Sequence, residues 1–193
     1  MTDRRTFLRG GLVASLVGGV LRPSGYAAFA AGPPRLSLHK VLVDGELAES
    51  VSYGEAAESG GFPLHVFACG DISDVWYDEL DLLWRQRRAP IAGLTRHGPL
   101  FVLERFAWDR GMRVVFRGEH SSGPATVVSH ELRGGEEAVA AASRLVASGA
   151  DWAEALALAS MLADPRPGPV RARTFTSAGP LSSGERLYSW VIA

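Results

Sequence analysis

Short apolar runs alternate with amphipathic stretches along this chain, and the clearest change from one to the other lies near residue 69. The run 62–68 is short and nearly continuous in apolar residues, which is typical of a strand covered on both faces. Beyond it, apolar residues recur at spacings of four and three, namely Ile72, Trp76, Leu80 and Leu83. That spacing indicates a helix that buries one side, and Pro90 ends it. We predict a strand over 62–68 and a helix over 71–88.

The same patterns divide the rest of the chain. They predict further strands over 36–43, 90–95, 113–117, 125–132, 170–176 and 186–192, and further helices over 46–59, 99–110, 134–148 and 152–163. Helices separate the first four strands, and this order favours a mostly parallel sheet with helices on both faces. The later elements predict a hairpin of the fourth and fifth strands, a C-terminal helical pair, and an antiparallel pair of the last two strands. The predicted fold class is therefore α/β.

Residues 1–30 have the order of a signal peptide. Basic residues lead into a short apolar run at 10–21, and Ala28-Phe29-Ala30 supplies a small-residue cleavage site. The apolar run is much shorter than the roughly 20 residues that span a bilayer, which disfavours a membrane anchor. Cleavage after Ala30 removes 30 of 193 residues and leaves 163, enough for one self-sufficient core. We predict a single α/β domain over 31–193 without a membrane span.

The paired Arg4 and Arg5, followed by Thr6 and then Phe7-Leu8, resemble the twin-arginine (Tat) translocation signal, in which any residue and then Phe-Leu-Lys follow the pair. Arg9 stands where lysine is commonest. The resemblance covers only the first thirty or so residues. It implies export to the periplasm by the Tat translocase after folding, either with a cofactor inserted in the cytoplasm or bound to a partner that holds one. The alternative is an ordinary secretory signal that contains two arginines.

Removing residues 1–30 changes the charge of the chain. The whole sequence has 20 basic and 21 acidic residues. The segment holds four arginines and one aspartate, so 16 basic and 20 acidic residues remain, with a net charge of −4. A mildly acidic domain without a basic patch is a poor binder of nucleic acid or anionic lipid. We expect neither class of partner.

Cys69 is the only cysteine, so an exported domain of this sequence has to be held together by its core and not by disulfides. A lone thiol at the end of a buried strand is either a small packed side chain or a reactive group. Both readings remain open on the sequence alone.

A candidate site follows if the strands 62–68, 90–95 and 113–117 are parallel neighbours. The turns beyond them would then meet at the carboxyl edge of the sheet, where open α/β sheets place their ligands. These turns carry Cys69, Asp71, Ser73, Thr95, His97, Glu119 and His120. A thiol with His97 or His120 supplies a nucleophile and a base, and the other four residues supply ligand-binding groups. The plainer roles are a helix cap for Asp71, a turn for His97 and a hairpin corner for Glu119-His120.

The remaining histidines and tryptophans favour packing roles. His39, His65 and His130 lie in predicted strands, and no two histidines have the spacing of a metal-binding pair, so we predict no metal site. Trp76, Trp84 and Trp108 fall at helical core spacing, and we expect them in the core rather than on a cofactor platform.

Two functions fit these features. The first is an exported periplasmic binding or accessory protein, which carries a small ligand or acts as the small subunit of an oxidoreductase whose larger partner holds the cofactor. The second is a small thiol-dependent enzyme, a hydrolase or a redox enzyme, that uses Cys69 with His97 or His120. The absence of a phosphate loop, dinucleotide fingerprint or nucleophile elbow favours the first. The sequence names no cofactor and no substrate.

Overall fold

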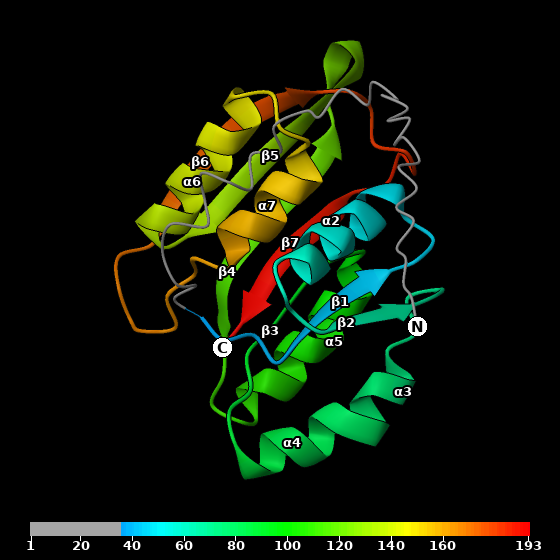
Figure 1. Cartoon of the computed structure of the whole chain (residues 1–193), viewed down its shortest axis with the longest axis vertical. Helices are drawn as coiled ribbons and strands as arrows, with labels where there is room; N and C mark the ends of the chain where they lie inside the picture. Colours follow the sequence, from blue (N-terminus) through cyan, green and yellow to red (C-terminus); the bar gives the residue numbers. More distant parts are fainter. Residues whose placement is uncertain (1–35) are drawn as a thin grey trace, which may run out of the picture.

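The computed structural model describes residues 36–193, and a seven-stranded sheet runs through them (Figure 1). The strands are β1 (Lys40–Asp44), β2 (Leu64–Phe67), β3 (Ile91–Thr95), β4 (Val114–Ser122), β5 (Val127–Gly134), β6 (Arg171–Ala178) and β7 (Leu187–Ile192). Their order in the sheet is β2-β1-β3-β7-β4-β5-β6. The predicted signal peptide, including Arg4 and Arg5, lies outside the described residues.

The prediction of a mostly parallel sheet is wrong. Only β2, β1 and β3 are parallel to one another, while the other four pairings in the described sheet are antiparallel. The cause is β7, which enters the middle of the sheet between β3 and β4 instead of pairing with β6. Alternation of apolar and polar residues shows that 186–192 is a strand, but it does not show which strands are its partners. The β4–β5 hairpin is confirmed.

Strand β4 is longer than predicted and contains Glu119 and His120 within the strand, not in a turn beyond it. The sequence suggested a turn because Gly118 punctuates the run. In the structure Gly118 provides space, since a Cβ at this position would lie 2.4 Å from Ser189 Oγ and 2.8 Å from the His120 ring. The glycine therefore permits close packing inside the sheet.

Helices cover both faces of the sheet, as predicted. On one face lie α2 (Ala48–Ser59), α6 (Glu136–Ala147) and α7 (Trp152–Ser160), which share a core with β1, β4 and β5 (Figure 1). On the other face lie α3 (Ser73–Val75), η1 (Trp76–Leu80), α4 (Asp81–Gln86) and α5 (His97–Trp108), around a second core. That second core contains no residue of β5 or β6. The outer face of this part of the sheet carries charged side chains instead.

The predicted helix 71–88 is present, but a π-helical turn, η1, divides it. Trp76 and Trp84 are buried as predicted. Leu80 is fully buried, whereas Leu82, which follows the π turn, is 56% exposed. Trp108 is also not a core residue: it is 59% exposed, and the Arg105 guanidinium lies 4.2 Å from its ring centroid.

None of the helices within residues 36–193 is long and apolar enough to cross a membrane.

Candidate functional site at the carboxyl edge of the parallel strands

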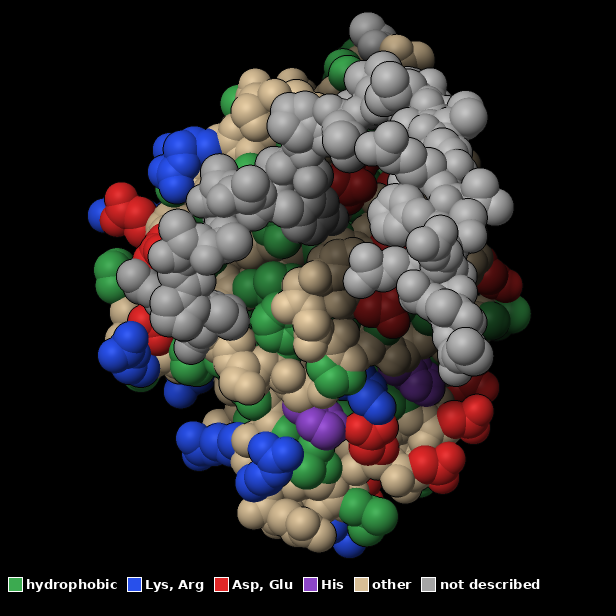
Figure 2. Space-filling view, viewed as in Figure 1, with side chains coloured by type: hydrophobic (Ala, Val, Ile, Leu, Met, Phe, Trp, Pro, Cys, Tyr) green, Lys and Arg blue, Asp and Glu red, His purple; other side chains and the backbone are tan. Residues whose placement is uncertain are grey.

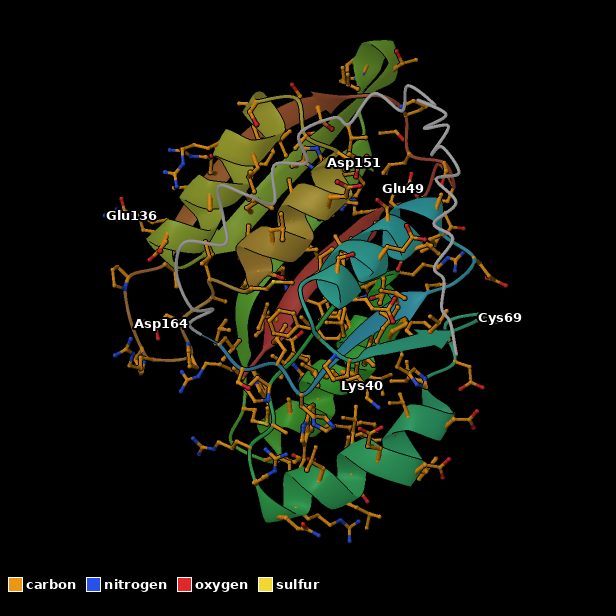
Figure 3. All side chains as sticks on the ribbon, viewed as in Figure 1. Lys40, Glu49, Cys69, Glu136, Asp151 and Asp164 are labelled. Atoms are coloured by element: carbon orange, nitrogen blue, oxygen red, sulfur yellow. The ribbon has the colours of Figure 1, made fainter. Side chains whose placement is uncertain are left out.

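The carboxyl ends of β1, β2 and β3 meet at one edge of the sheet, as the sequence predicted for β2 and β3. Asp44 ends β1, Cys69 follows β2, and Arg96 follows β3. Cys69 lies in the loop that projects from this edge (Figure 3). Because the three strands are parallel neighbours, side chains from distant parts of the sequence come together here.

Arg96 is the centre of this edge. Its Nη1 donates hydrogen bonds to Asp44 Oδ2 and, at 3.4 Å, to Glu46 Oε2. Its Nε donates to Glu185 Oε2 at 2.7 Å. The hydrogen bond to Glu185 and the charge of Asp44 raise the pKa of Arg96 above its ordinary value. One guanidinium thus faces three carboxylates, and Asp44, which is fully buried, depends on it for neutralisation.

Cys69 is exposed, so it is not the small packed side chain of the first reading. Its Sγ donates a hydrogen bond to Glu46 Oε1 at 3.2 Å. This hydrogen bond and the charge of Glu46 raise the pKa of Cys69, because both favour the neutral thiol over the thiolate. The residue also has a left-handed backbone, with φ of 55°. The thiol is therefore accessible but is not activated by its surroundings.

The two histidines proposed as bases are engaged elsewhere. His97 begins α5, and its ring lies 5.1 Å from that of Tyr188 and 5.9 Å from that of Phe101. His120 is buried in β4, where one ring nitrogen contacts His130 Nδ1 and the other contacts Ser189 Oγ. Across β7, Glu119 pairs with Tyr188, which is also the partner of Thr95, so this part of β4 is level with the carboxyl edge. Strand β7 lies between it and β3, and the His120 ring is engaged with His130 and Ser189 instead of Cys69. No hydrogen bond within residues 36–193 joins the thiol to an imidazole.

The four predicted ligand-binding residues do not converge. Asp71 Oδ1 accepts the backbone N–H of Ser73 at 2.9 Å, and this side-chain and backbone hydrogen bonding lowers the pKa of Asp71. Both residues therefore shape the entry to α3. Thr95 is fully buried, accepts a hydrogen bond from Trp190 Nε1 at 3.1 Å and donates to Arg96 O. Glu119 faces the outer side of the sheet, 3.7 Å from Arg186 Nη1.

Sequence reasoning missed the residues that organise this edge. Arg96 was inside a predicted turn, between two residues that were singled out, and Asp44 stood at the end of a predicted strand. Both positions lie at the carboxyl ends of predicted strands, which could have indicated them as site residues. Glu185 is 89 positions from Arg96, and only the insertion of β7 beside β3 brings it close.

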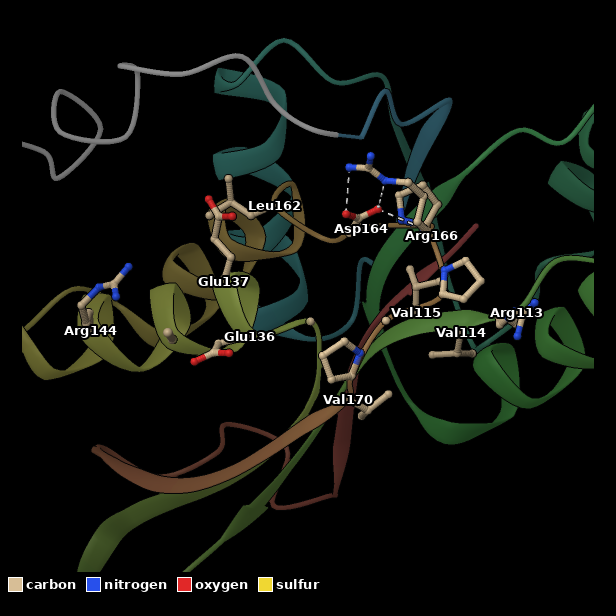
Figure 4. A pocket seen from close by; sticks show the side chains of 16 residues that line it. Arg113, Val114, Val115, Glu136, Glu137, Arg144, Leu162, Asp164, Arg166 and Val170 are labelled. Atoms are coloured by element: carbon tan, nitrogen blue, oxygen red, sulfur yellow. Dashed lines mark hydrogen bonds and ion pairs between the residues drawn. The ribbon is translucent and has the colours of Figure 1, made fainter.

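A cavity lies at the opposite edge of the sheet. Strand β4 runs in the direction of β3, since both are antiparallel to β7, so its first residues are far from the carboxyl edge. The cavity has a volume of about 840 Å³ and lies between the start of β4, α6 and the proline-rich loop 164–170 (Figure 4). Its apolar lining includes Val114, Val115, Leu162, Val170 and three prolines.

Six charged residues also line this cavity: Arg113, Glu136, Glu137, Arg144, Asp164 and Arg166. Arg166 Nε donates to Asp164 Oδ1 at 3.0 Å, and Arg171 Nε lies 3.5 Å from Glu136 Oε2. Glu137 also has an interaction partner. The side chains of Arg113 and Arg144 form no ion pair within residues 36–193. The six charges sum to zero, and these two arginines are the ones that are left without an ion pair there.

The two edges differ in the charges around them. Acidic side chains gather over α3 and η1 on the right of the view, while basic side chains are frequent along the left side, with some acidic neighbours (Figure 2). The labelled Cys69 and Asp164 lie on opposite sides of the molecule (Figure 3). Within residues 36–193, no three His, Cys, Asp or Glu side chains are grouped closely enough to hold a metal ion.

No family model, curated protein or solved structure matches this chain.

Proposed function

We propose that the chain is a periplasmic binding or accessory protein, exported by the twin-arginine route, whose ligand site is the cavity between α6 and the loop 164–170. The observation that carries the proposal is the pair of arginines in the cavity, Arg113 and Arg144, which have no carboxylate partner among the described residues. A guanidinium binds a carboxylate or a phosphate in a planar, two-point arrangement. The apolar walls suit the carbon skeleton of such a ligand.

The ligand class that fits is a small organic anion. Arg113 and Arg144 line different ends of the cavity (Figure 4), so each can hold a negative group, and Val114 and Leu162 supply apolar contacts for the rest of the ligand. The first turn of α6 adds little to this preference, because Glu136 and Glu137 offset the positive end of the helix. The selectivity therefore rests on the arginines. In an accessory role, the same protein would bind a larger redox subunit that holds the cofactor.

The thiol-dependent enzyme has less support. Cys69 is accessible, but its hydrogen bond to Glu46 stabilises the protonated thiol. A catalytic cysteine needs the opposite environment, with a neighbouring base or a positive charge that stabilises the thiolate. Neither His97 nor His120 is hydrogen-bonded to Cys69.

The test is purification from periplasm under native conditions, followed by native mass spectrometry. We expect a small organic anion bound to the wild-type chain, and its loss from the Arg113→Ala, Arg144→Ala double variant. Arg105→Ala is the matched control, since Arg105 stacks on Trp108 away from the cavity. A stable complex with a cofactor-bearing subunit supports the accessory role. A ligand-free monomer whose thiol reacts rapidly at neutral pH would contradict both roles and restore the enzyme hypothesis.

A further inference from the structure

Two buried histidines face each other across the β4–β5 hairpin. His120 and His130 are directly opposed in the strand register, both are fully buried, and their Nδ1 atoms lie 2.9 Å apart. The outer nitrogen of each ring contacts a serine: His120 Nε2 lies 2.9 Å from Ser189 Oγ, and His130 Nε2 lies 2.8 Å from Ser177 Oγ. The hydrogen-bond chain therefore crosses β7, β4, β5 and β6 in the order of the sheet.

The number of protons on the two imidazoles and two serines decides whether this hydrogen-bond chain stays intact. Each of the three contacts needs one hydrogen, and two neutral imidazoles with one serine hydroxyl supply all three. One additional proton fits on an outer nitrogen with every contact kept, but it places a positive charge in the core. A second additional proton puts an N–H on both Nδ1 atoms, which face each other at 2.9 Å. The central hydrogen bond then cannot exist.

Within residues 36–193, no carboxylate shifts the pKa of either imidazole, so a charge on these rings has no counter-charge beside it. The neighbours are mainly aromatic: the Trp152 ring lies 4.7 Å from that of His120 and 5.0 Å from that of His130, and Phe175 lies 5.0 Å from His130. Burial lowers the pKa of His130 to about 4. Burial, together with the charge of His130, lowers the pKa of His120 well below its ordinary value.

The charged side chains on the elements that surround the two histidines are engaged with other groups or face away from the pair. Arg173 of β6 shares the face of Ser177 but donates to Ser143 of α6 at 2.7 Å. Asp151, before α7, accepts the N–H groups of Ala153 and Glu154. Burial and the charges of Asp151 and Glu55 raise the pKa of Glu154 in α7. The charged side chains of β4 and β5 line the outer face of the sheet: Arg117, Glu119, Glu131 and Arg133.

We propose that the His120–His130 pair is an acid-operated latch that holds β5, β6 and the α6–α7 layer onto the rest of the sheet and releases them when it takes up protons. Strand β6 is at the edge of the described sheet, where it pairs with β5 alone. Trp152, which packs on both imidazoles, begins α7. The strands β2, β1 and β3 are paired with one another and with β7 without contacts from the latch, so their backbone pairing is kept when it opens.

The latch also bears on the ligand cavity, because α6 and the loop leading into β6 form its walls. Acid release of the ligand rests on the proposed function, whereas the release of β6 and α7 does not. The two claims are tested separately: the opening by hydrogen exchange on ligand-free protein, and the ligand release by native mass spectrometry at the same two pH values.

The hydrogen-exchange experiment compares the mature chain at pH 7 and pH 5, corrected for the intrinsic exchange rate. The open state has ordinary histidine pKa values near 6.5 and binds more protons than the closed state between about pH 4 and 6.5, so acid favours opening. We expect the opening constant of amides in β5, β6 and α7 to rise about twenty-fold for each histidine between pH 7 and pH 5. Amides of β1 and β3 should change little. Equal changes in both sets would overturn the proposal.

Variants separate the latch from general acid sensitivity. His130→Asn leaves one titrating ring and should lose roughly half of the pH dependence on a logarithmic scale. His97→Asn removes a histidine that is not part of the hydrogen-bond chain, so this variant should keep the full pH dependence. If His130→Asn does not fold, nitrogen-15 imidazole spectra of the wild-type protein decide the question. Two rings that stay neutral down to pH 5 with one shared Nδ1 proton support the latch, and a ring that titrates near pH 6.5 in the folded protein overturns it.

Discussion

The carboxylate of Glu46 is shared between a thiol and a guanidinium. Its Oε1 accepts from Cys69 and its Oε2 accepts from Arg96, which is itself held by Asp44 and Glu185. The same few groups therefore set both the reactivity of the cysteine and the stability of the buried aspartate. Single substitutions at this edge separate the two effects.

Replacing Glu46 with glutamine should make the thiol more reactive. The change removes the negative charge that favours the neutral thiol, so the pKa of Cys69 should fall. We expect faster alkylation by iodoacetamide at pH 7.5 and a shift of the whole rate profile to lower pH. Glu49→Gln is the control, since the Glu49 carboxylate contacts Ser182 and not Cys69. An unchanged rate profile in Glu46→Gln would show that Glu46 does not affect the pKa of Cys69 in solution.

Replacing Arg96 with alanine should destabilise the fold. Asp44 is fully buried and would lose its counter-charge, whereas the arginine is 30% exposed. We expect a loss of about 3 kcal/mol in the free energy of unfolding, toward the lower end for a broken buried pair. Adding Asp44→Asn should recover part of this loss. Arg133→Ala, which breaks an exposed pair with Glu131, should cost less than about 1 kcal/mol. Equal losses in the two arginine variants would contradict the assignment.

At the scale of elements, the π turn η1 decides which side chains of the 73–86 segment face the core. Trp76, at its start, stacks on Phe106 of α5 with ring centroids 3.9 Å apart, and it meets Trp84 edge-on at 5.8 Å. Tyr77 and Leu82 are left exposed. One turn of irregular helix therefore docks the segment onto α5 through aromatic rings.

The two tryptophans of this layer should respond differently to truncation. Trp76→Ala removes a side chain that is 8% exposed and should cost about 3–5 kcal/mol of unfolding free energy. Trp108→Ala is its matched control, because that ring is 59% exposed, and it should cost less than about 1 kcal/mol. Chemical denaturation of both variants measures the difference. A small loss for Trp76 would show that this layer is not a core.

The sequence predicted the elements better than their partners. Local spacing was enough to place β2, the helical segment after it, and α7, because each pattern depends on neighbouring residues only. The position of β7 depends on contacts across more than ninety positions, which periodicity does not contain. The same limit explains the candidate site. Cys69 and Thr95 were placed correctly at the edge. Glu119 and His120 are level with Thr95 across β7 but lie inside a strand and not in a turn, because Gly118 allows close packing where the sequence suggested a turn.

At the scale of the whole molecule, the described chain has two cores, one on each face of the sheet, and needs no disulfide. The face that carries α2, α6 and α7 is continuous across the sheet, while the other ends at β4 (Figure 1).

Replacing Arg4 and Arg5 together with lysine should block export. The twin-arginine motif requires the pair, so we expect unprocessed protein in the cytoplasm, detected by cell fractionation and immunoblotting. Arg9→Lys is the matched control, because it introduces the residue that is commonest in the motif, and it should leave export and cleavage after Ala30 unchanged. Normal processing of the double lysine variant would remove the twin-arginine assignment and leave an ordinary secretory signal.

The strand order makes β7 the link between the two halves of the described sheet. It is the last described strand in the sequence, and it alone joins the β2-β1-β3 group to the β4-β5-β6 group there. Its register pairs Ile192 with Ile91 and Leu187 with His120, so both of its pairings join residues that are far apart in the sequence. Pairings of this kind are slow to form, because a long loop must close before they bring any stabilisation. Until β7 is in place, β3 and β4 each keep an edge of unpaired backbone groups that can pair with another chain.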